Sequence, residues 1–313
     1  SLERVYSYDP VPDSLTRAEA AHILSAQANL WTEYLKTPQA IDYMVWPRAL
    51  ALAEVTWSTQ DARDWNSFVA RMPRALRTLG MLGVNYRVPH VEGLEGDRLT
   101  LEDKVQVRLY SLMPGGEIRY TTDGSDPTLA STKYTVPFEI PVGQPGTKVT
   151  ARVFTSDGKS SAPRAATFTR TTYRPADRLN VIQPGIRYQY YETRVRSVRA
   201  IDTIPATSEA VIVGVRRRGT ERAEQYAIRL TGYLRVPNDA LYEFALSSDD
   251  GSNLDIGGRI IVDNDGFHGD EERTGMIALR AGLHPFTVRY FQATGGASLS
   301  LRYRRGEGAW AVV

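Results

Sequence analysis

Residues 23–33 read ILSAQANLWTE, a short and mostly apolar stretch bounded by polar residues. This pattern predicts a buried β-strand, here from His22 to Trp31. Trp31 and Glu33 come at its end, where barrel enzymes gather the side chains that contact ligands. An indole can cover the apolar face of a sugar, and a carboxylate can accept hydrogen bonds from two hydroxyls. Spacing alone favours a plainer interpretation, a core tryptophan and a solvated glutamate.

Helical periodicity surrounds this stretch. Apolar residues recur at helical spacing over residues 41–55, and again over residues 65–79 at steps of three and four. Asp61 or Asp64 can cap the start of the second helix, and Gly80 or Gly83 suits its end. Residues 1–88 are therefore predicted to be helical with one short buried strand.

From about residue 89 the pattern changes to strands. Residues 105–110 and 117–121 alternate with period two. Closely spaced turn signals follow these strands: Pro114-Gly115-Gly116, Asp123-Gly124, Pro145-Gly146 and Asp157-Gly158. We predict a small β-sandwich over residues 89–173 and, after a linker with three Pro or Gly positions, a second all-β module over residues 174–313. Arg216-Arg217-Arg218 is interpreted as a solvated surface.

Composition excludes several classes of function. The 313 residues are 42% hydrophobic and 10% aromatic, enough apolar side chain to fold two or three domains. The 38 basic and 36 acidic residues give a net charge of +2, so no nucleic-acid partner is expected. Without cysteine, disulfide scaffolds, thiol catalysis and cysteine-ligated metals are excluded. The four histidines lie far apart, and no apolar run of about 18 residues predicts a membrane span.

Three stretches of residues 1–88 resemble the end of a glycoside hydrolase family 20 catalytic barrel. They are residues 5–12 with 23–33, residues 43–58 (YMVWPRALALAEVTWS) and residues 77–87. The resemblance is long, ordered and specific. Ser25 stands where the family usually has glycine, which affects local packing but leaves Trp31 and Glu33 in place.

The resemblance implies a multidomain α/β plus all-β fold class: the last part of a (β/α)8 barrel followed by two β-sandwich modules. Such a barrel needs about 250 residues and eight strands, so its earlier strands must come from upstream sequence or from another chain. The apolar faces around Trp46, Trp57 and Phe68 are expected to pack against those strands. The chain begins Ser1-Leu2-Glu3-Arg4 without an initiator methionine, so we expect an internal start with any export signal upstream.

Family members are β-N-acetylhexosaminidases, which remove terminal N-acetylglucosamine or N-acetylgalactosamine by substrate-assisted catalysis. The resemblance implies that Trp31 lines the pocket for the terminal sugar and that Glu33 holds its outer hydroxyls. The family's catalytic Asp–Glu pair sits on an earlier barrel strand, so no catalytic residue is assigned in this chain. Its one Asp-Glu dipeptide, Asp270-Glu271, lies in the third module and is interpreted as a turn or surface loop.

The two β modules carry resemblances of their own. Residues 115–128 resemble the small sandwich that follows such barrels, where Asp123-Gly124 makes a tight hairpin. Residues 232–237, 242–254, 262–269 and 281–286 resemble the protective-antigen type of β-sandwich, which recurs in secreted glycosidases and adhesins. Some relatives bind glycans through calcium held by a paired aspartate motif, which Asp249-Asp250 match. In the alternative, this pair only orders a loop through hydrogen bonds to the backbone. No other cofactor or metal is expected.

These expectations lead to one main hypothesis. The chain is the C-terminal part of an exo-acting, extracytoplasmic β-N-acetylhexosaminidase, with N-acetylhexosamine-terminated glycans and the upstream barrel portion as partners. It supplies part of the sugar pocket and is inactive alone. The alternative is a non-catalytic carbohydrate-binding or adhesion protein that acts through the terminal sandwich. A third hypothesis makes both β modules spacers without glycan affinity. Residues 1–88 favour the first hypothesis, because a binding protein does not need the end of a barrel.

Overall fold

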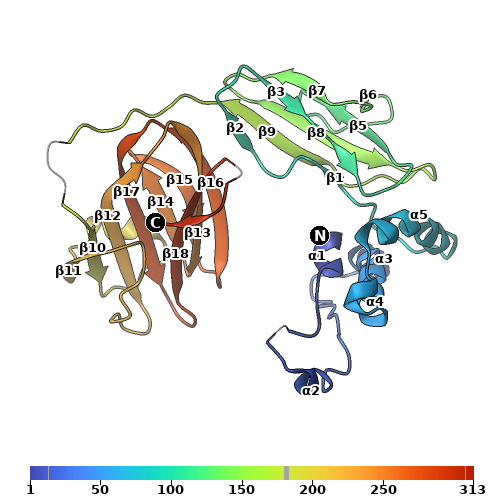
Figure 1. Cartoon of the computed structure of the whole chain (residues 1–313), viewed down its shortest axis with the longest axis horizontal. Helices are drawn as coiled ribbons and strands as arrows, with labels where there is room; N and C mark the ends of the chain where they lie inside the picture. Colours follow the sequence, from blue (N-terminus) through green and yellow to red (C-terminus); the bar gives the residue numbers. More distant parts are fainter. Residues whose placement is uncertain (13, 180–182, 307) are drawn as a thin grey trace. The chain divides into compact units, whose positions relative to one another are not determined.

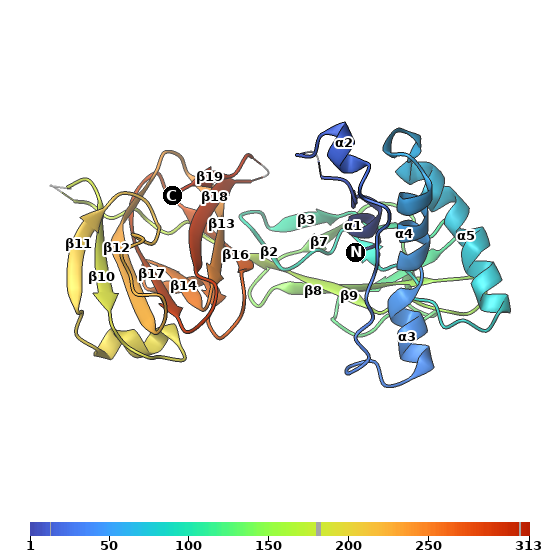
Figure 2. The same cartoon turned by 90° about the horizontal axis from the view of Figure 1, so that it is seen from below.

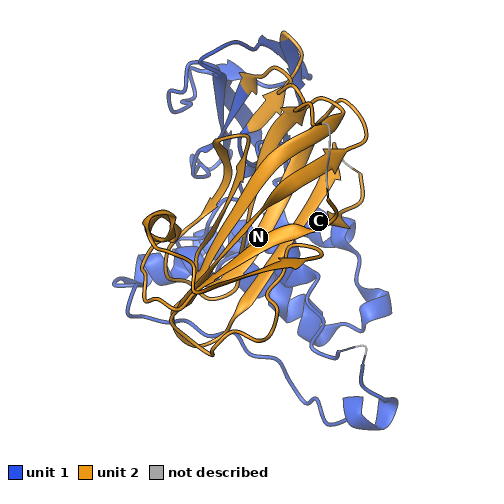
Figure 3. Ribbon diagram, turned by 90° about the vertical axis from the view of Figure 1, so that its left-hand side faces the viewer, with its two compact units in different colours: residues 1–97, 104–168 blue, residues 98–103, 169–313 orange. Residues whose placement is uncertain are grey.

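The computed structural model describes residues 1–12, 14–179, 183–306 and 308–313. The chain divides into two compact units (Figure 3), one of residues 1–97 and 104–168 and one of residues 98–103 and 169–313. Each unit is described by itself. Among the described residues, no helix is both long enough and apolar enough to cross a membrane.

The first unit begins with helices (Figure 1). They are α1 (Leu2–Tyr6), α2 (Arg17–Ala20), α3 (Pro38–Val45), α4 (Arg48–Trp57), a 3-10 turn (Gln60–Ala62) and α5 (Trp65–Met81). Asp64 caps α5 by accepting a hydrogen bond from the Ser67 backbone N–H at 2.6 Å, which confirms one of the two predicted caps. Gly83, just after the helix, has a φ of +74° that favours glycine.

The strands of the small sandwich follow. They are β1 (Val91–Glu92), β2 (Arg98–Thr100), β3 (Lys104–Val107), β4 (Tyr110–Ser111), β5 (Glu117–Thr121), β6 (Thr132–Lys133), β7 (Phe138–Pro141), β8 (Thr147–Phe154) and β9 (Arg164–Arg170). The main sheet has the order β2-β9-β8-β5-β6, and β3 pairs with β7 as β1 does with β4. These strands confirm the expected small β-sandwich.

Figure 2 shows the helices α4 and α5 in front of the strands of the small sandwich. The helices and the sandwich share one hydrophobic core, in which Phe68, Met72 and Leu76 on one face of α5 belong to the same buried cluster as Val149 and Val153 on β8. The spacing of three and four on α5 and the alternation on β8 bring these apolar side chains to a common interior. The predicted boundary at residue 88 therefore falls inside one compact unit, and the domain boundaries stay predictions.

The second unit contains the terminal sandwich. Its strands are β10 (Ile186–Tyr191), β11 (Ser208–Ile212), β12 (Tyr226–Val236), β13 (Ala240–Asp249), β14 (Ser252–Ile256), β15 (Arg259–Asn264), β16 (Glu271–Leu279), β17 (Gly282–Gln292), β18 (Ser298–Arg305) and β19 (Ala311–Val312), with a 3-10 helix at Val198–Thr203. One sheet has the order β11-β10-β12-β17-β14-β15 and the other β16-β13-β18-β19. The two sheets enclose an aromatic-rich core that includes Tyr226, Phe244 and Tyr290.

One predicted element is not formed. Residues 22–31 adopt no strand, and Leu24 on this segment is 90% exposed. A parallel barrel strand is held by hydrogen bonds to a neighbour on each side. The described part of the chain supplies no such neighbour, so the prediction of a buried strand is wrong for this chain by itself.

Candidate functional site

The predicted sugar-pocket residues lie on an exposed segment between α2 and α3. Trp31 is 71% exposed and Glu33 is also exposed. Local contacts shape this segment: the Gln27 amide donates to Asn29 Oδ1 at 3.3 Å, and the Leu35 N–H donates to the Thr32 carbonyl at 3.2 Å. Within the described ranges, no hydrogen bond or ion pair holds the side chain of Trp31 or Glu33. Both groups are therefore free to contact another surface.

Other large apolar side chains of the first unit are exposed too. Trp57 ends α4 and Met81 ends α5, and both are largely exposed, as are Leu82, Leu24 and Tyr34. Single exposed apolar residues are ordinary, so the expectation that the face around Trp57 packs against barrel strands stays a prediction. Phe68 differs, because it packs against Tyr6 and Trp65 in the unit's own core. The expectation that Phe68 faces missing strands is wrong.

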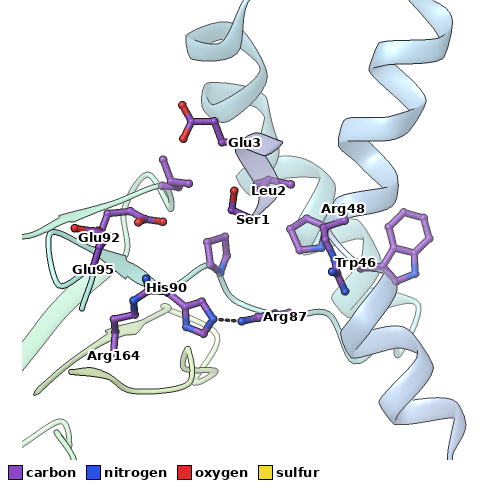
Figure 4. A pocket seen from close by; sticks show the side chains of 13 residues that line it. Ser1, Leu2, Glu3, Trp46, Arg48, Arg87, His90, Glu92, Glu95 and Arg164 are labelled. Atoms are coloured by element: carbon purple, nitrogen blue, oxygen red, sulfur yellow. Dashed lines mark hydrogen bonds between the residues drawn. The ribbon is translucent and has the colours of Figure 1, made fainter. Parts of the chain in front are cut away.

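A cavity of about 400 Å³ lies between the helices and the sandwich of the first unit (Figure 4). Trp46 and Arg48 line it at the junction of α3 and α4, whereas Glu92 on β1 lines it from the sandwich. Burial and then the charge of Arg87 lower the pKa of Arg48. Burial, a hydrogen bond with Glu95 and the charge of Glu95 raise the pKa of Glu92. The cavity thus has Arg48 and Arg87 on one side and Glu92, Glu95 and Arg164 on the other.

Sequence analysis did not single out this cavity. Two signals were available, because Arg48 lies within residues 43–58 and Arg87 ends residues 77–87, both parts of the family resemblance. None of the predicted site residues lines the cavity. It lies where helices meet a sandwich, and its arginines are bonded within the protein, Arg48 to the Met44 carbonyl, Arg87 to His90 and Arg164 to the Leu94 carbonyl. We assign it no chemistry.

In the second unit, three carboxylates gather at one end of the sandwich. We call Asp249, Asp250 and Asp270 the acidic loop cluster. Asp249 ends β13 and is joined to Asp250 by a cis peptide bond. Asp250 is buried, and its Oδ2 accepts the Ala293 N–H at 2.8 Å. Burial, then the charges of Asp250 and Asp270, raise the pKa of Asp249.

The rest of the cluster is also bonded within the protein. Asp270 Oδ1 accepts hydrogen bonds from the hydroxyls of Ser247 at 3.1 Å and Ser298 at 2.5 Å. Glu271 begins β16 and pairs with Arg273 at 2.8 Å. Asp270 therefore lies in the expected loop, whereas Glu271 is the first residue of β16 and pairs with Ser248 in the sheet, so the expectation of a turn or surface loop is correct for Asp270 only.

The donor set of the cluster fits calcium poorly. Calcium takes six to eight oxygen ligands, but the described residues contain no group of three or more acidic or histidine side chains arranged for a metal ion. One oxygen of Asp250 already accepts a backbone N–H. Two observations favour an additional ligand: Asn264 Oδ1, buried nearby, has no partner, and no described residue forms a hydrogen bond or ion pair with the Asp249 carboxylate. We derive no step through calcium.

The fold defines a class of architecture: a helical segment that shares a core with a small β-sandwich, followed by a second all-β module. Three family comparisons agree with this description. "Glycosyl hydrolase family 20, catalytic domain" matches residues 1–60, "Chitobiase/beta-hexosaminidase C-terminal domain" matches residues 98–165, and "PA14 domain" matches residues 217–309.

Curated relatives give the same assignment. A beta-hexosaminidase of Porphyromonas gingivalis is 31% identical over 306 residues, which is 94% of this chain and 38% of the relative. A beta-hexosaminidase of Emericella nidulans is 44% identical over 62 residues, 20% of this chain and 10% of the relative. The chain is therefore similar to beta-hexosaminidases over most of its length. It comprises the C-terminal part of a glycosyl hydrolase family 20 catalytic domain, the C-terminal sandwich and a PA14 domain. It spans about two fifths of the length of the bacterial relative.

A solved structure similar to the second unit is described as "PA14 sugar-binding domain from RTX adhesin". It is 20% identical, with a TM-score of 0.37, and the match covers 41% of this chain and 94% of that chain.

Proposed function

We propose that this chain is the C-terminal part of an exo-acting, extracytoplasmic β-N-acetylhexosaminidase. In this proposal Trp31 and Glu33 form part of the wall of the pocket that receives the terminal N-acetylhexosamine. The observation that carries it is the exposed 23–33 segment, which presents both side chains without partners beside helices that match the end of a family 20 catalytic domain.

The two side chains would have different roles in the pocket. The indole of Trp31 offers a flat apolar face for the C–H groups of a pyranose. The carboxylate of Glu33 accepts hydrogen bonds and so can hold two neighbouring hydroxyls. Neither group supplies a proton to the leaving oxygen. In family 20 the acetamido oxygen of the substrate attacks C1, and we propose that the Asp–Glu pair that assists it belongs to the upstream part of the barrel.

The proposal is tested with a chromogenic N-acetyl-β-glucosaminide. The 313-residue chain alone should show no turnover, and the longer protein that includes the upstream barrel should be active. In that longer protein, Trp31→Ala and Glu33→Gln should each lower kcat/KM by about tenfold or more, because each removes a contact worth about 1.5–3 kcal/mol.

A matched control is Tyr233→Ala, which removes an exposed aromatic ring from β12 in the second unit and should leave kcat/KM unchanged. Turnover by the isolated chain would show that a proton donor lies within residues 1–313 and would refute the upstream placement of the pair. Unchanged kinetics in both pocket variants would refute the roles of Trp31 and Glu33.

A second candidate function is glycan binding by the terminal sandwich. The observation that favours it is Phe267, which is 59% exposed, packs edge-on against Phe291 at 5.6 Å and belongs to the same loop as Asp270. An exposed ring beside carboxylates can stack on a sugar while the carboxylates bind its hydroxyls. Titration of the whole chain with N-acetylglucosamine oligomers, followed by NMR, should then shift resonances of the terminal sandwich. These ligand-induced shifts should disappear in Phe267→Ala and remain in Trp31→Ala. No shift would support the spacer hypothesis.

A further inference from the structure

His268 lies in the loop between β15 and β16, next to the acidic loop cluster. Its Nδ1 lies 2.8 Å from the Gly269 carbonyl oxygen and its Nε2 lies 2.9 Å from the Asn264 carbonyl oxygen. A carbonyl oxygen can only accept a hydrogen bond, so each ring nitrogen must carry a hydrogen. Only the imidazolium form has a hydrogen on both nitrogens. The geometry of this loop therefore requires a positively charged ring.

Two other histidines of the chain show the contrast. His284, buried in the second unit, has Nδ1 2.9 Å from an Arg174 guanidinium nitrogen and Nε2 2.8 Å from the Arg280 carbonyl oxygen. One partner can only donate and the other can only accept, which selects a neutral ring. His90 likewise has an arginine at one nitrogen and a carbonyl at the other. His268 differs because both of its partners are acceptors.

The charges around His268 favour the same form. Burial by itself lowers the pKa of His268, but the bonds to the Asn264 and Gly269 carbonyls, and then the charges of Glu271 and Asp250, outweigh burial and raise it. The charge of His268 in turn opposes the rise in the pKa of Asp249. The titratable groups that face this region are Asp249 and Asp250 from the end of β13, and Asp270 and Glu271 from the start of β16, with Arg273 paired to Glu271.

We propose that the imidazolium of His268 is the resident cation of the acidic loop cluster and orders the Asp249–Asp250 turn without a metal ion. The ring holds the β15–β16 loop by its two carbonyl bonds, and its positive charge acts on Asp249 and Asp250 through space rather than by direct contact. His268 is thus a positioning residue, since both of its N–H groups are used inside the protein. The proposal does not depend on whether the loop binds a glycan.

The charge of His268 offsets the repulsion that Asp250 and Asp270 exert on the Asp249 carboxylate. Asp250 is buried and Asp249 is partly buried, so each carboxylate needs a compensating charge or hydrogen bonds. Ala293 supplies a hydrogen bond to Asp250, and two serines supply them to Asp270. His268 supplies the charge. In a loop that uses calcium, the ion would have this task and chelation would disorder the loop.

The first experiment reads the charge of His268 directly. Nitrogen and carbon NMR shifts of the imidazole rings distinguish the imidazolium from the two neutral tautomers. At neutral pH we expect His268 to be charged, with a midpoint above the ordinary value near 6.5. The midpoint of His268 should fall in Glu271→Gln. A neutral His268 at and below about pH 6.5 would overturn the proposal.

The second experiment compares calcium with the imidazolium. Thermal unfolding of the whole chain should be the same with EGTA and with millimolar calcium. Because the folded-state pKa of His268 is raised, its stabilising effect is complete below the unfolded value and is lost as pH rises through the folded value. His268→Gln should remove this loss, which begins as the pH rises above about 6.5, whereas His22→Gln, at an exposed position, should keep it.

His268→Lys restores the positive charge without the two carbonyl bonds and should recover part of the lost stability at neutral pH. A calcium-dependent rise in the unfolding temperature of the wild-type chain would overturn the proposal and assign the cation role to the metal. If His268→Gln does not fold, the NMR measurement of the His268 protonation state in the wild-type chain still tests the proposal.

Discussion

Tyr86 links the segment after α5 to a turn of the small sandwich. Its hydroxyl donates to Asp157 Oδ2 at 3.0 Å, and the Lys159 ammonium lies 3.7 Å from the centre of its ring. Burial, followed by the bond to Asp157, raises the pKa of Tyr86 to about 12, so the hydroxyl keeps its proton at neutral pH.

Removing this hydroxyl should be measurable. Tyr86→Phe keeps the ring and loses one hydrogen bond to a charged acceptor, so it should lower the free energy of unfolding of the first unit by about 1–2 kcal/mol in urea at neutral pH. Tyr110→Phe, at an exposed tyrosine, should lower it by less than about 0.5 kcal/mol. Equal effects would contradict a specific role of the Asp157 bond.

His90 should give the opposite pH dependence to His268. Burial, and then the charges of Arg87 and Arg164, lower its pKa. A histidine with a lowered folded pKa contributes stability that is complete above the unfolded value near 6.5 and is lost as pH falls through the folded value. His90→Gln should therefore reduce the decline in urea midpoint below about pH 6.5. A steeper decline in the variant would contradict a lowered pKa of His90 in the folded state.

For single residues, the sequence indicated which side chains are candidates for function, but not what surrounds them in the structure. Trp31 and Glu33 were singled out from a motif, and they stay predictions, because their neighbours in the proposed pocket are not among the described residues. His268 was seen only as one of four histidines without metal spacing. Its charge depends on two backbone carbonyls, of Asn264 and Gly269, and the direction of a carbonyl is set by loop conformation rather than by residue type.

Among the elements, α5 carries most of the helical contribution to the first core. Met72 is 2% exposed on its inner face, and Met81 is 81% exposed at its end. Met72→Ala should cost about 2–5 kcal/mol of unfolding free energy, because it leaves a cavity in packed surroundings. Met81→Ala should cost less than about 0.5 kcal/mol. Chemical denaturation measures both, and a similar cost for the two would contradict the assigned inner face.

Helices and strands that have sequence signals of their own, such as caps, periodicity and turn residues, were predicted correctly. The expected strand at residues 22–31 has no such signals and was predicted wrongly. The α5 helix has its own cap, periodicity and terminal glycine, and the strands of both sandwiches alternate or lie between turn residues. Residues 22–31 have only an apolar composition, and their strand character depends on partners elsewhere. The burial of Phe68 was also misjudged, because Tyr6 and Trp65 fill the place expected for upstream strands.

For the whole molecule, separate hydrophobic cores are the main feature. One buried cluster includes residues from Leu2 to Phe168, and the other two lie within residues 188–301. Calorimetry should therefore resolve two unfolding transitions. Met72→Ala should lower the temperature of one, and Leu230→Ala, in the core of the terminal sandwich, should lower that of the other. Movement of both transitions by either substitution would show that the units unfold cooperatively.

The exposed 23–33 segment has an entropic consequence. In the chain alone its backbone is held by few bonds, so fixing it as a barrel strand would cost about 1–2 kcal/mol for each residue ordered. Separately produced halves of the proposed barrel would meet this cost together with the loss of free translation when they associate. Complementation in trans should consequently be weak, and a covalent link between the halves should restore it by raising the effective concentration.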